Sequence, residues 1–363
     1  MEFAFSQEQD MLRESVARFL EKNYDFDTRQ ALVRSDTAWS EDVWSQFAEL
    51  GLLALPFSED KGGLGGSIAD CVAFAGHFGK HLVIEPYAHS IMLAGAALEA
   101  SDHEGATAWL EKLASGEAIV AFAYEEGAGT STPEMIQTRA SGSGNAVTLR
   151  GEKRLVIAGA QADAVIVAAR TDDQTIGLFL VAKDAPGLGI RSYTTIDGQS
   201  AAKMTFNDTP AQTLMRDAGE ALDTILTNAI IVQSAEAVGA MEALLATTAE
   251  YAMTRKQFGK PIMMFQSVAH RLSDMKIAYT KALSTLTYTT ALANSGGASA
   301  RDVAVLKGQI GKLGREIGEA AIQTHGGVGM TDELNVSHYH KRLLAYDAQL
   351  GDHAYHLRVV GRA

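Results

Sequence analysis

The chain has 363 residues, of which 47% are hydrophobic and 21% charged, a composition typical of a soluble globular protein with two or three domains. Its formal net charge of −13 argues against a nucleic-acid binder but leaves room for a local basic site. The single cysteine, Cys71, excludes an intrachain disulfide and argues against a cysteine-based metal site, and we expect no metal.

The sequence shows no targeting or membrane signal. Met1 is followed by Glu2 and no apolar leader, so no signal peptide is expected. No uninterrupted apolar run looks long enough to span a bilayer. We therefore expect a cytoplasmic protein without a membrane span.

The N-terminal third predicts helices. Ser6 and Gln9 have the spacing of a capping box, and apolar residues follow at helical intervals. A second helix is expected over 43–50. The Gly-rich stretch 56–67 reads as a loop, and helical patterns resume over 68–113.

The middle of the chain predicts strands. Short runs rich in Val, Ile and Leu are separated by Gly, Asn and Asp, at 118–126, 146–159, 162–170 and 176–184. Helical periodicity returns at Asp217 and persists to the end. Strands segregated from helices imply separate domains and not a parallel α/β sheet.

We therefore predict an α+β multidomain fold with three domains. An N-terminal helical domain covers 1–115, a β-barrel or sandwich covers 116–217, and a four-helix bundle covers 218–363.

One break interrupts the C-terminal helical region. The stretch 251–266 reads YAMTRKQFGKPIMMFQ, and Gly259 and Pro261 disfavour a continuous helix there. The break is either an ordinary helix corner or a corner that meets a ligand.

The chain resembles the acyl-CoA dehydrogenase family of flavoproteins over nearly its whole length. The match is strongest over 255–266 and over Gln323-Thr-His-Gly-Gly-Val-Gly329 with Glu333, and the loop 56–66 and Gly151-Glu-Lys153 match as well. The resemblance implies FAD as cofactor, acyl-CoA as substrate and an electron-transferring flavoprotein as electron acceptor.

The resemblance also implies that the corner lies against the FAD of a neighbouring subunit. Arg255 would pair with the pyrophosphate, which suits a guanidinium fork. The other residues implied at the adenosine half of the cofactor are Phe258, Gln266, Gln323, Gly326 and Gly327.

The catalytic base of the family is absent where it is expected. The family reaction removes an α proton with a Glu and passes a β hydride to the flavin. An ungapped count puts Leu350 at that Glu, and the position used by a minority of members falls near Ala229. Asp352 is the nearest carboxylate, and a solvated or helix-capping Asp needs no catalytic role. We interpret the histidines near the C-terminus as surface residues or as side chains whose hydrogen bonds are satisfied within the protein.

The face expected to hold the chain's own flavin also departs from the family. Thr-Glu-Pro is replaced by Tyr124-Glu125-Glu126, the Ser that follows by Thr130, and Trp-Ile-Thr by Leu155-Val156-Ile157. Each hydrogen-bond partner lost to a buried polar ring costs about 1–3 kcal/mol. The face toward a neighbour's FAD is thus kept, while the face for the chain's own flavin is altered.

This pattern resembles the base-lacking subunit of heteromeric members that act on steroid side-chain thioesters. We expect a subunit of a homo- or hetero-tetramer whose homologous partner supplies the base. Three alternatives remain: a self-sufficient dehydrogenase with a relocated base such as Asp352, a flavin oxidase or monooxygenase of the same fold, and a structural or regulatory subunit that binds neither FAD nor acyl-CoA.

Overall fold

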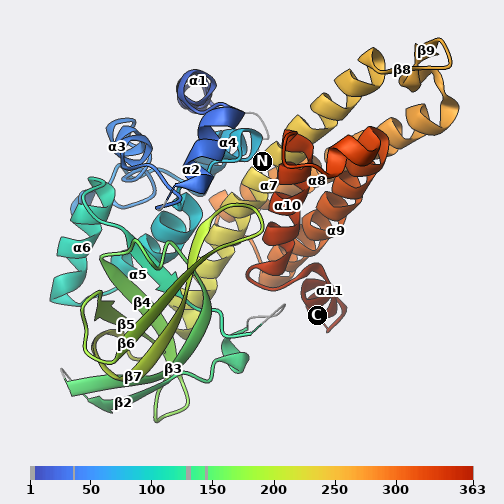
Figure 1. Ribbon diagram of the computed structural model, residues 1–363. Helices are drawn as coiled ribbons and strands as arrows, with labels where there is room; N and C mark the ends of the chain where they lie inside the picture. Colours follow the sequence, from blue (N-terminus) through green and yellow to red (C-terminus); the bar gives the residue numbers. More distant parts are fainter. Residues whose placement is uncertain (1–4, 36, 128–131, 144–145, 363) are drawn as a thin grey trace. The chain divides into compact units, whose positions relative to one another are not determined.

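Helices occupy both ends of the sequence and strands its middle, as the sequence predicts (Figure 1). A computed structural model describes residues 5–35, 37–127, 132–143 and 146–362. The chain divides into two compact units, each built from separate stretches. The first comprises Met1–Arg29, Val72–Val83 and Ile230–Ala363, and the second comprises Gln30–Cys71 and Ile84–Ala229.

The first unit is helical and contains the C-terminal bundle. Its complete helices are α1 (Gln7–Asn23), α8 (Gln266–Asn294), α9 (Ala300–His325), α10 (Asn335–Ala348) and α11 (His353–Arg362). Most of α4 (Ile68–His81), most of α7 (Gly219–Thr254) and the start of α2 (Phe26–Arg34) also belong to it. The capping box predicted for α1 is confirmed, because the Ser6 and Gln9 side chains each accept the other's backbone N–H.

Glycines allow the helices of this unit to approach closely. A Cβ on Gly79 of α4 would lie 1.7 Å from the carbonyl oxygen of Glu236 on α7. On α9, a Cβ on Gly311 would lie 2.2 Å from Asp347 Oδ1, and one on Gly318 would lie 2.0 Å from His340 Nδ1. The side chains of α10 therefore pack directly against the backbone of α9.

Helix α7 is longer and more apolar than the sequence reading anticipated. By length and composition alone, the helix Gly219–Thr254 is long and apolar enough to cross a membrane, a feature that the sequence analysis did not anticipate. Of its most apolar window, 72% is buried inside the protein, as is usual for a core helix.

The second unit combines short helices with all seven long strands. Its helical segments are the rest of α2, α3 (Glu41–Glu49), η1 (Glu59–Lys61), the π-helical η2 (Tyr87–Gly95), α5 (Ala96–Glu99), α6 (Glu104–Ala114) and η3 (Pro133–Met135). The helical pattern over 68–113 is therefore interrupted. It breaks near Leu82, whose φ of 54° ends α4, and again before α6.

The strands of this unit form a small barrel. They are β1 (Val120–Ala123), β2 (Arg139–Ser143), β3 (Ala146–Ile157), β4 (Ala164–Arg170), β5 (Ile176–Ala182), β6 (Leu188–Thr194) and β7 (Ser200–Met215). Pairing runs β4-β2-β3-β7-β5 and returns to β4, which closes the barrel. Strand β1 adds to β4 in parallel, and β6 adds to β7 antiparallel. Residues 164–169 of β4 and 177–181 of β5 are buried on both faces of the strands.

The predicted α+β architecture, with a β-barrel between helical parts, is confirmed. The predicted domain boundaries at 115 and 217 do not coincide with the limits of the two contact-defined units. The division into three domains stays a prediction.

Candidate functional site

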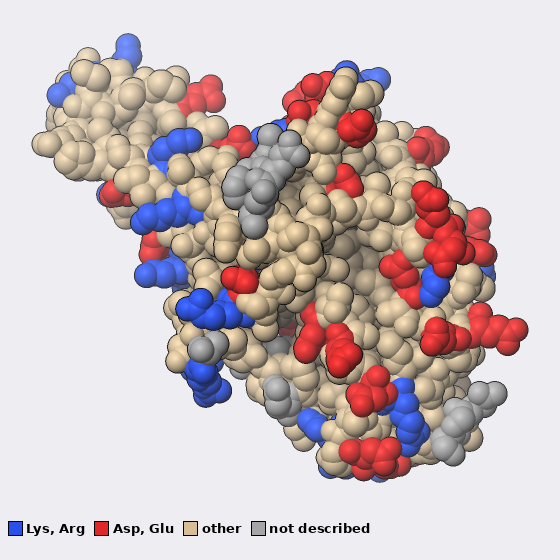
Figure 2. Space-filling model, turned by 180° about the vertical axis from the view of Figure 1, so that it is seen from behind, with Lys and Arg blue, Asp and Glu red and all other residues tan. Residues whose placement is uncertain are grey.

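The break in the C-terminal helical region is a short β-hairpin. Helix α7 ends at Thr254, β8 (Lys256–Gln257) pairs with β9 (Lys260–Pro261), and η4 (Ile262–Met264) leads into α8. The amide of Ile262 donates to the Arg255 carbonyl at 2.8 Å and closes the corner. The corner lies at the end of the α7–α8 helix pair (Figure 1). Seen from behind, this end carries basic side chains on a mostly uncharged surface (Figure 2).

The tip of the hairpin holds an aromatic residue in a left-handed conformation. Phe258 has φ 51° and Gly259 has φ 79°, the pair of positive angles that a two-residue hairpin loop requires. The Phe258 side chain is 91% exposed and touches Phe265 edge-on, with ring centroids 6.1 Å apart. Left-handed backbone costs a non-glycine residue about 1–2 kcal/mol. A strained, exposed aromatic is therefore a feature that packing within the chain does not account for.

The remaining corner residues present charge and polarity to solvent. Arg255 and Gln266 are exposed, and Gln266 opens α8. The ammonium of Lys260 lies 4.4 Å from the centroid of the Phe265 ring. The corner thus combines a guanidinium, an ammonium and aromatic rings within one short segment.

The second sequence motif forms the end of α9. Gly326 has φ 67°, and a Cβ on either Gly326 or Gly327 would meet no atom within 4 Å. Both glycines and Gln323 are exposed. The open backbone of η5 (Gly326–Met330) therefore allows another group to come close to the chain.

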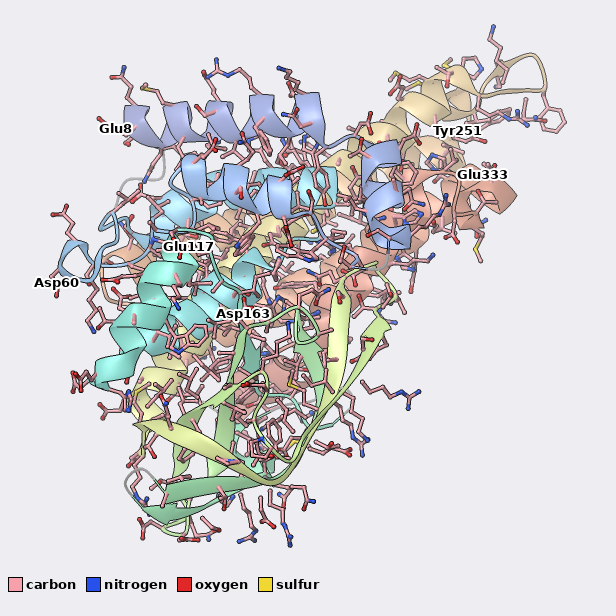
Figure 3. All side chains as sticks on the ribbon, turned by 60° about the vertical axis from the view of Figure 1, so that its left-hand side comes forward. Glu8, Asp60, Glu117, Asp163, Tyr251 and Glu333 are labelled. Atoms are coloured by element: carbon pink, nitrogen blue, oxygen red, sulfur yellow. The ribbon has the colours of Figure 1, made fainter. Side chains whose placement is uncertain are left out.

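The two motifs are joined by one ring contact. Tyr251 on α7, labelled in Figure 3, stacks on His325 at a centroid distance of 4.3 Å. The Tyr251 hydroxyl also donates to the His325 carbonyl oxygen at 3.5 Å. Burial lowers the pKa of His325, so its ring is neutral at pH 7. Arg255 lies four residues after Tyr251, and Gly326 lies one residue after His325. The stack therefore brings the two motifs together.

The position expected for the catalytic Glu lies in the turn between α10 and α11. Leu350 is 6% exposed and has φ 53°. Asp352 accepts the Tyr355 amide at 2.7 Å through Oδ1, so its carboxylate caps α11. Ala229, near the position that a minority of family members use for the base, is fully buried. Neither expected position carries a group that takes a proton.

A buried polar network holds this turn, and the sequence reading missed its key residue. Lys307 on α9 is fully buried and donates to the carbonyls of Tyr346 at 2.6 Å and Asp347 at 3.2 Å. The Asp347 carboxylate accepts His353 Nδ1 at 2.7 Å, and His356 Nε2 donates to the Leu350 carbonyl at 3.0 Å. The only signal for Lys307 was a charge inside the apolar run VAVLKGQI. The network fixes the path of the backbone on both sides of Leu350.

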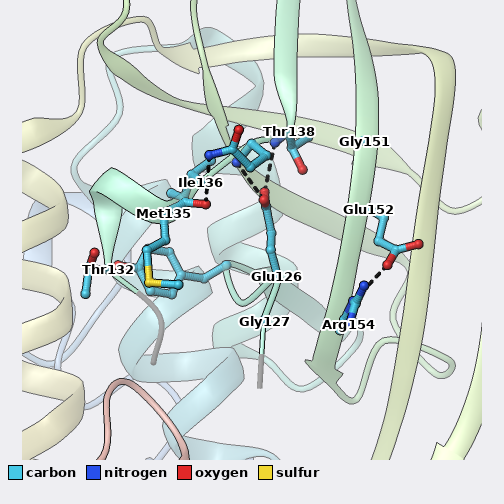
Figure 4. A pocket seen from close by; sticks show the side chains of 11 residues that line it. Glu126, Gly127, Thr132, Met135, Ile136, Thr138, Gly151, Glu152 and Arg154 are labelled. Atoms are coloured by element: carbon cyan, nitrogen blue, oxygen red, sulfur yellow. Dashed lines mark hydrogen bonds and ion pairs between the residues drawn. The ribbon is translucent and has the colours of Figure 1, made fainter. Parts of the chain in front are cut away.

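The barrel unit contains a cavity of about 310 Å³ beside the altered flavin motif (Figure 4). Its wall includes Tyr124, Glu126, Thr138 and Arg154. The sequence analysis named Tyr124 and Glu126 within the motif expected at the flavin, but not Thr138 or Arg154. The full lining consists of Tyr124, Glu126, Gly127, Thr132, Met135, Ile136, Gln137, Thr138, Gly151, Glu152 and Arg154.

Glu126, in the wall of this cavity, forms an ion pair with a buried lysine. Lys153 is fully buried and donates to Glu126 Oε1 at 2.7 Å and to the Tyr124 carbonyl at 3.0 Å. Burial lowers the pKa of Lys153 to about 8, although Glu126 acts in the opposite direction. Burial also opposes ionisation of Glu126, but Lys153 and the amides of Gln137 and Thr138 outweigh it and lower the pKa. Each group therefore favours the charged form of the other across the 2.7 Å contact.

The other residues of the predicted flavin face do not all gather at this cavity. Leu155 is half-buried and pairs with Glu125 through an isolated bridge. Ile157 is buried and lines a separate, much smaller cavity with Trp39 and Pro86. Thr130 lies outside the described residues. Within the described ranges, no three or more His, Cys, Asp or Glu side chains come together as a metal-binding group.

Comparison with known proteins gives one consistent result. The N-terminal, middle and C-terminal domain families of acyl-CoA dehydrogenases match residues 6–117, 121–209 and 220–363. Acyl-CoA dehydrogenase FadE27 of Mycobacterium tuberculosis is 28% identical over 344 residues, covering 92% of this chain and 91% of that protein.

Two solved structures show the same fold at full length. The ChsE4-ChsE5 complex from Mycobacterium tuberculosis superposes with a TM-score of 0.91 at 26% identity, covering 100% of this chain and 98% of the other. A variant of the Tcur3481-Tcur3483 steroid ACAD gives a TM-score of 0.91 at 25% identity, covering 98% and 97%.

Proposed function

The chain belongs to the acyl-CoA dehydrogenase family, and we propose that it is a subunit of a heteromeric enzyme of that family whose homologous partner carries the catalytic base. Members of the family are FAD-dependent oxidoreductases that act on the CH–CH bond of acyl-CoA thioesters. When bound, FAD supplies the acceptor for the hydride that leaves the acyl β carbon. The similarity to a steroid ACAD supports a steroid side-chain thioester as the substrate class.

The observation that carries this proposal is the contrast between the corner and the α10–α11 turn. The corner is preformed, with exposed Arg255, the strained Phe258 and open backbone at Gly326 held together by the Tyr251–His325 stack. The turn, in contrast, presents a buried leucine in place of a proton-accepting side chain. A chain that keeps a cofactor-binding surface but lacks a base fits a subunit that completes the site of another.

The residues of the corner suit the adenosine pyrophosphate half of FAD. The Arg255 guanidinium would bind the diphosphate, and Phe258 would offer its ring to the adenine. The open backbone at Gly326 and Gly327 leaves room for this half of the cofactor. On the chain's own side, Leu155 and Ile157 offer no donor to a flavin ring, so cofactor held by this chain alone would be weakly bound.

The chain's own residues then have positioning roles. The Lys307 network holds the α10–α11 turn, and Leu350 closes it with an apolar side chain that excludes water. Asp352 is engaged in capping α11, so removal of the α proton falls to a carboxylate of the partner. We further propose a cytoplasmic tetramer with an electron-transferring flavoprotein as acceptor, and the similarity to the solved ChsE4-ChsE5 complex supports its heteromeric composition.

The test is to measure flavin absorbance and acyl-CoA turnover, first with the chain alone and then with a co-expressed homologous partner that has the Glu. We expect substoichiometric FAD and negligible turnover alone, and both restored in the complex. Full FAD with turnover that Asp352→Asn abolishes would establish a self-sufficient dehydrogenase. Oxygen-dependent turnover without a partner would indicate an oxidase or monooxygenase, and a complex that binds neither FAD nor acyl-CoA would indicate a structural subunit.

A further inference from the structure

Exposed methionines gather at the corner that joins α7 and α8 and at the adjoining η5. Six methionines in the described part of the chain are exposed, and four of these, between 36% and 71% exposed, lie here. Methionine is among the residue types most often buried, so this grouping is unusual for a surface. We call these four residues the methionine cluster: Met253 in the last turn of α7, Met263 and Met264 in η4, and Met330 at the end of η5.

The backbone brings the members of the cluster to the same end of the helical unit. Met253 lies two residues after Tyr251, whose ring stacks on His325 directly before η5. Segment η4 begins at Ile262, and the amide of Ile262 donates to the Arg255 carbonyl at 2.8 Å, so η4 folds back onto the end of α7. Every member of the methionine cluster therefore lies within five residues of one of these two contacts.

A thioether at the surface is open to oxidation by hydrogen peroxide. Sulfur takes one oxygen atom from the peroxide and gives up two electrons, the O–O bond breaks, and the rest of the peroxide leaves as water. The apolar side chain becomes a polar sulfoxide, which methionine sulfoxide reductases convert back. The single cysteine of the chain does not compete, because Cys71 is fully buried and burial raises the pKa of its thiol to about 12.

We propose that the methionine cluster is a site of reversible oxidation by peroxide, and that its sulfoxides prevent the corner from completing the FAD site of the partner subunit. The four sulfurs lie in the same short segments as Arg255, Phe258 and Gly326, the residues proposed to meet the cofactor. In the complex this surface is covered, so a sulfoxide oxygen there loses its water without gaining a hydrogen-bond donor. This assignment rests on the proposed function, because that function supplies the partner and the cofactor.

The first measurement is FAD titration of the reconstituted complex. The chain is used untreated or after oxidation with hydrogen peroxide, and catalase removes the peroxide before partner and FAD are added. Oxidation should weaken FAD binding about tenfold, because buried sulfoxide oxygens are left without donors. Treatment of the oxidised chain with the two methionine sulfoxide reductases, one for each sulfoxide epimer, should restore the affinity.

Leucine variants identify the sulfurs that matter, because leucine is close to methionine in volume and cannot form a sulfoxide. In the variant that combines the four changes, FAD affinity should be the same before and after peroxide, whatever its untreated value. The four changes are Met253→Leu, Met263→Leu, Met264→Leu and Met330→Leu. The matched control is Met11→Leu, which removes an exposed methionine of α1 and should leave the tenfold loss in place.

The second measurement locates the sulfoxides by mass spectrometry of proteolytic peptides. In the lone chain, the methionine cluster should oxidise faster than Met241 and Met275, which are buried in the helical unit. In the assembled complex, the cluster should be protected relative to Met11, because the partner and FAD cover the corner. A cluster that oxidises equally in the lone chain and in the complex would overturn the inference.

The remaining outcomes separate this inference from the proposed function. Equal FAD affinity after full conversion of the cluster to sulfoxide would overturn the inference, as would a tenfold loss that persists in the variant with four leucines. Both results leave the proposed function untouched, because the untreated complex still binds FAD. An untreated complex that does not bind FAD would overturn the proposed function and this inference together.

Discussion

The ring of Tyr251 on α7 stacks on the ring of His325 at the end of α9, with centroids 4.3 Å apart and ring planes inclined by 23°. These residues lie 74 positions apart in the sequence. Tyr251 lies four residues before Arg255, and His325 belongs to the second motif and directly precedes Gly326, so the stack holds Arg255 and the open backbone at Gly326 in one region. A ligand that touches both motifs therefore meets a preformed surface, which lowers the entropic cost of binding.

The first prediction concerns Arg255. Arg255→Ala should weaken FAD binding to the reconstituted complex by about 1.5–3 kcal/mol, because a charge-assisted contact to the pyrophosphate is lost. The melting temperature of the lone chain should hardly change, since the side chain is exposed. Fluorescence titration with FAD measures the effect. Arg301→Ala, which removes an exposed arginine at the start of α9, is the charge-matched control. Equal FAD affinity in all three proteins would mean that the corner is only a helix corner.

The second prediction separates strain from binding at Phe258. Phe258→Gly should stabilise the isolated chain by about 1 kcal/mol, because glycine adopts φ 51° without a Cβ penalty. The same variant should weaken FAD binding in the complex, because the ring is gone. Phe258→Ala keeps the strain and loses the ring, so it should lose affinity without gaining stability. Urea unfolding and FAD titration of both variants test this, and unchanged FAD affinity would remove Phe258 from the proposed site.

The third prediction concerns a carboxyl restored at position 350. Leu350→Glu places it at a site that is 6% exposed, and burial should raise its pKa well above the usual range. Because the folded pKa would exceed the unfolded one, the destabilisation should grow as pH rises from about 4.3 through the folded pKa. Leu350→Met should show no such dependence. Urea unfolding at pH 5 and pH 8 measures it, and equal losses at both pH values would place the new carboxyl in solvent.

The fourth prediction is acid sensitivity through His356. Burial lowers the pKa of His356 to about 4 from 6.5 in the unfolded chain, so the folded state binds fewer protons between these values. Stability should therefore be complete above pH 6.5 and fall as pH decreases toward 4, by about 3 kcal/mol from this group. His356→Gln should remove part of that slope. The exposed His270→Gln serves as control, and an identical pH slope in wild type and His356→Gln would contradict the assignment.

The sequence by itself determined the class of fold, the order of its parts and the two motifs of the corner. Periodicity and turn residues are local properties, so the capping box at Ser6, the strands from Val120 and the break at Gly259 followed from neighbouring residues. The sequence also showed that position 350 has no proton-accepting side chain, because Leu350 is aliphatic wherever the chain places it.

Only the tertiary structure decided which distant side chains meet. The stack of Tyr251 on His325, the hydrogen bonds of Lys307 to the α10–α11 turn and the ion pair of Lys203 with Glu152 each join segments far apart in sequence. Position in sequence put Leu155 and Ile157 on one flavin face, whereas the structure gives Ile157 to a different cavity from Tyr124. Periodicity fixes the direction of a side chain within its own helix or strand. The neighbour it meets depends on strand register and helix packing, which are set by burial of the whole core.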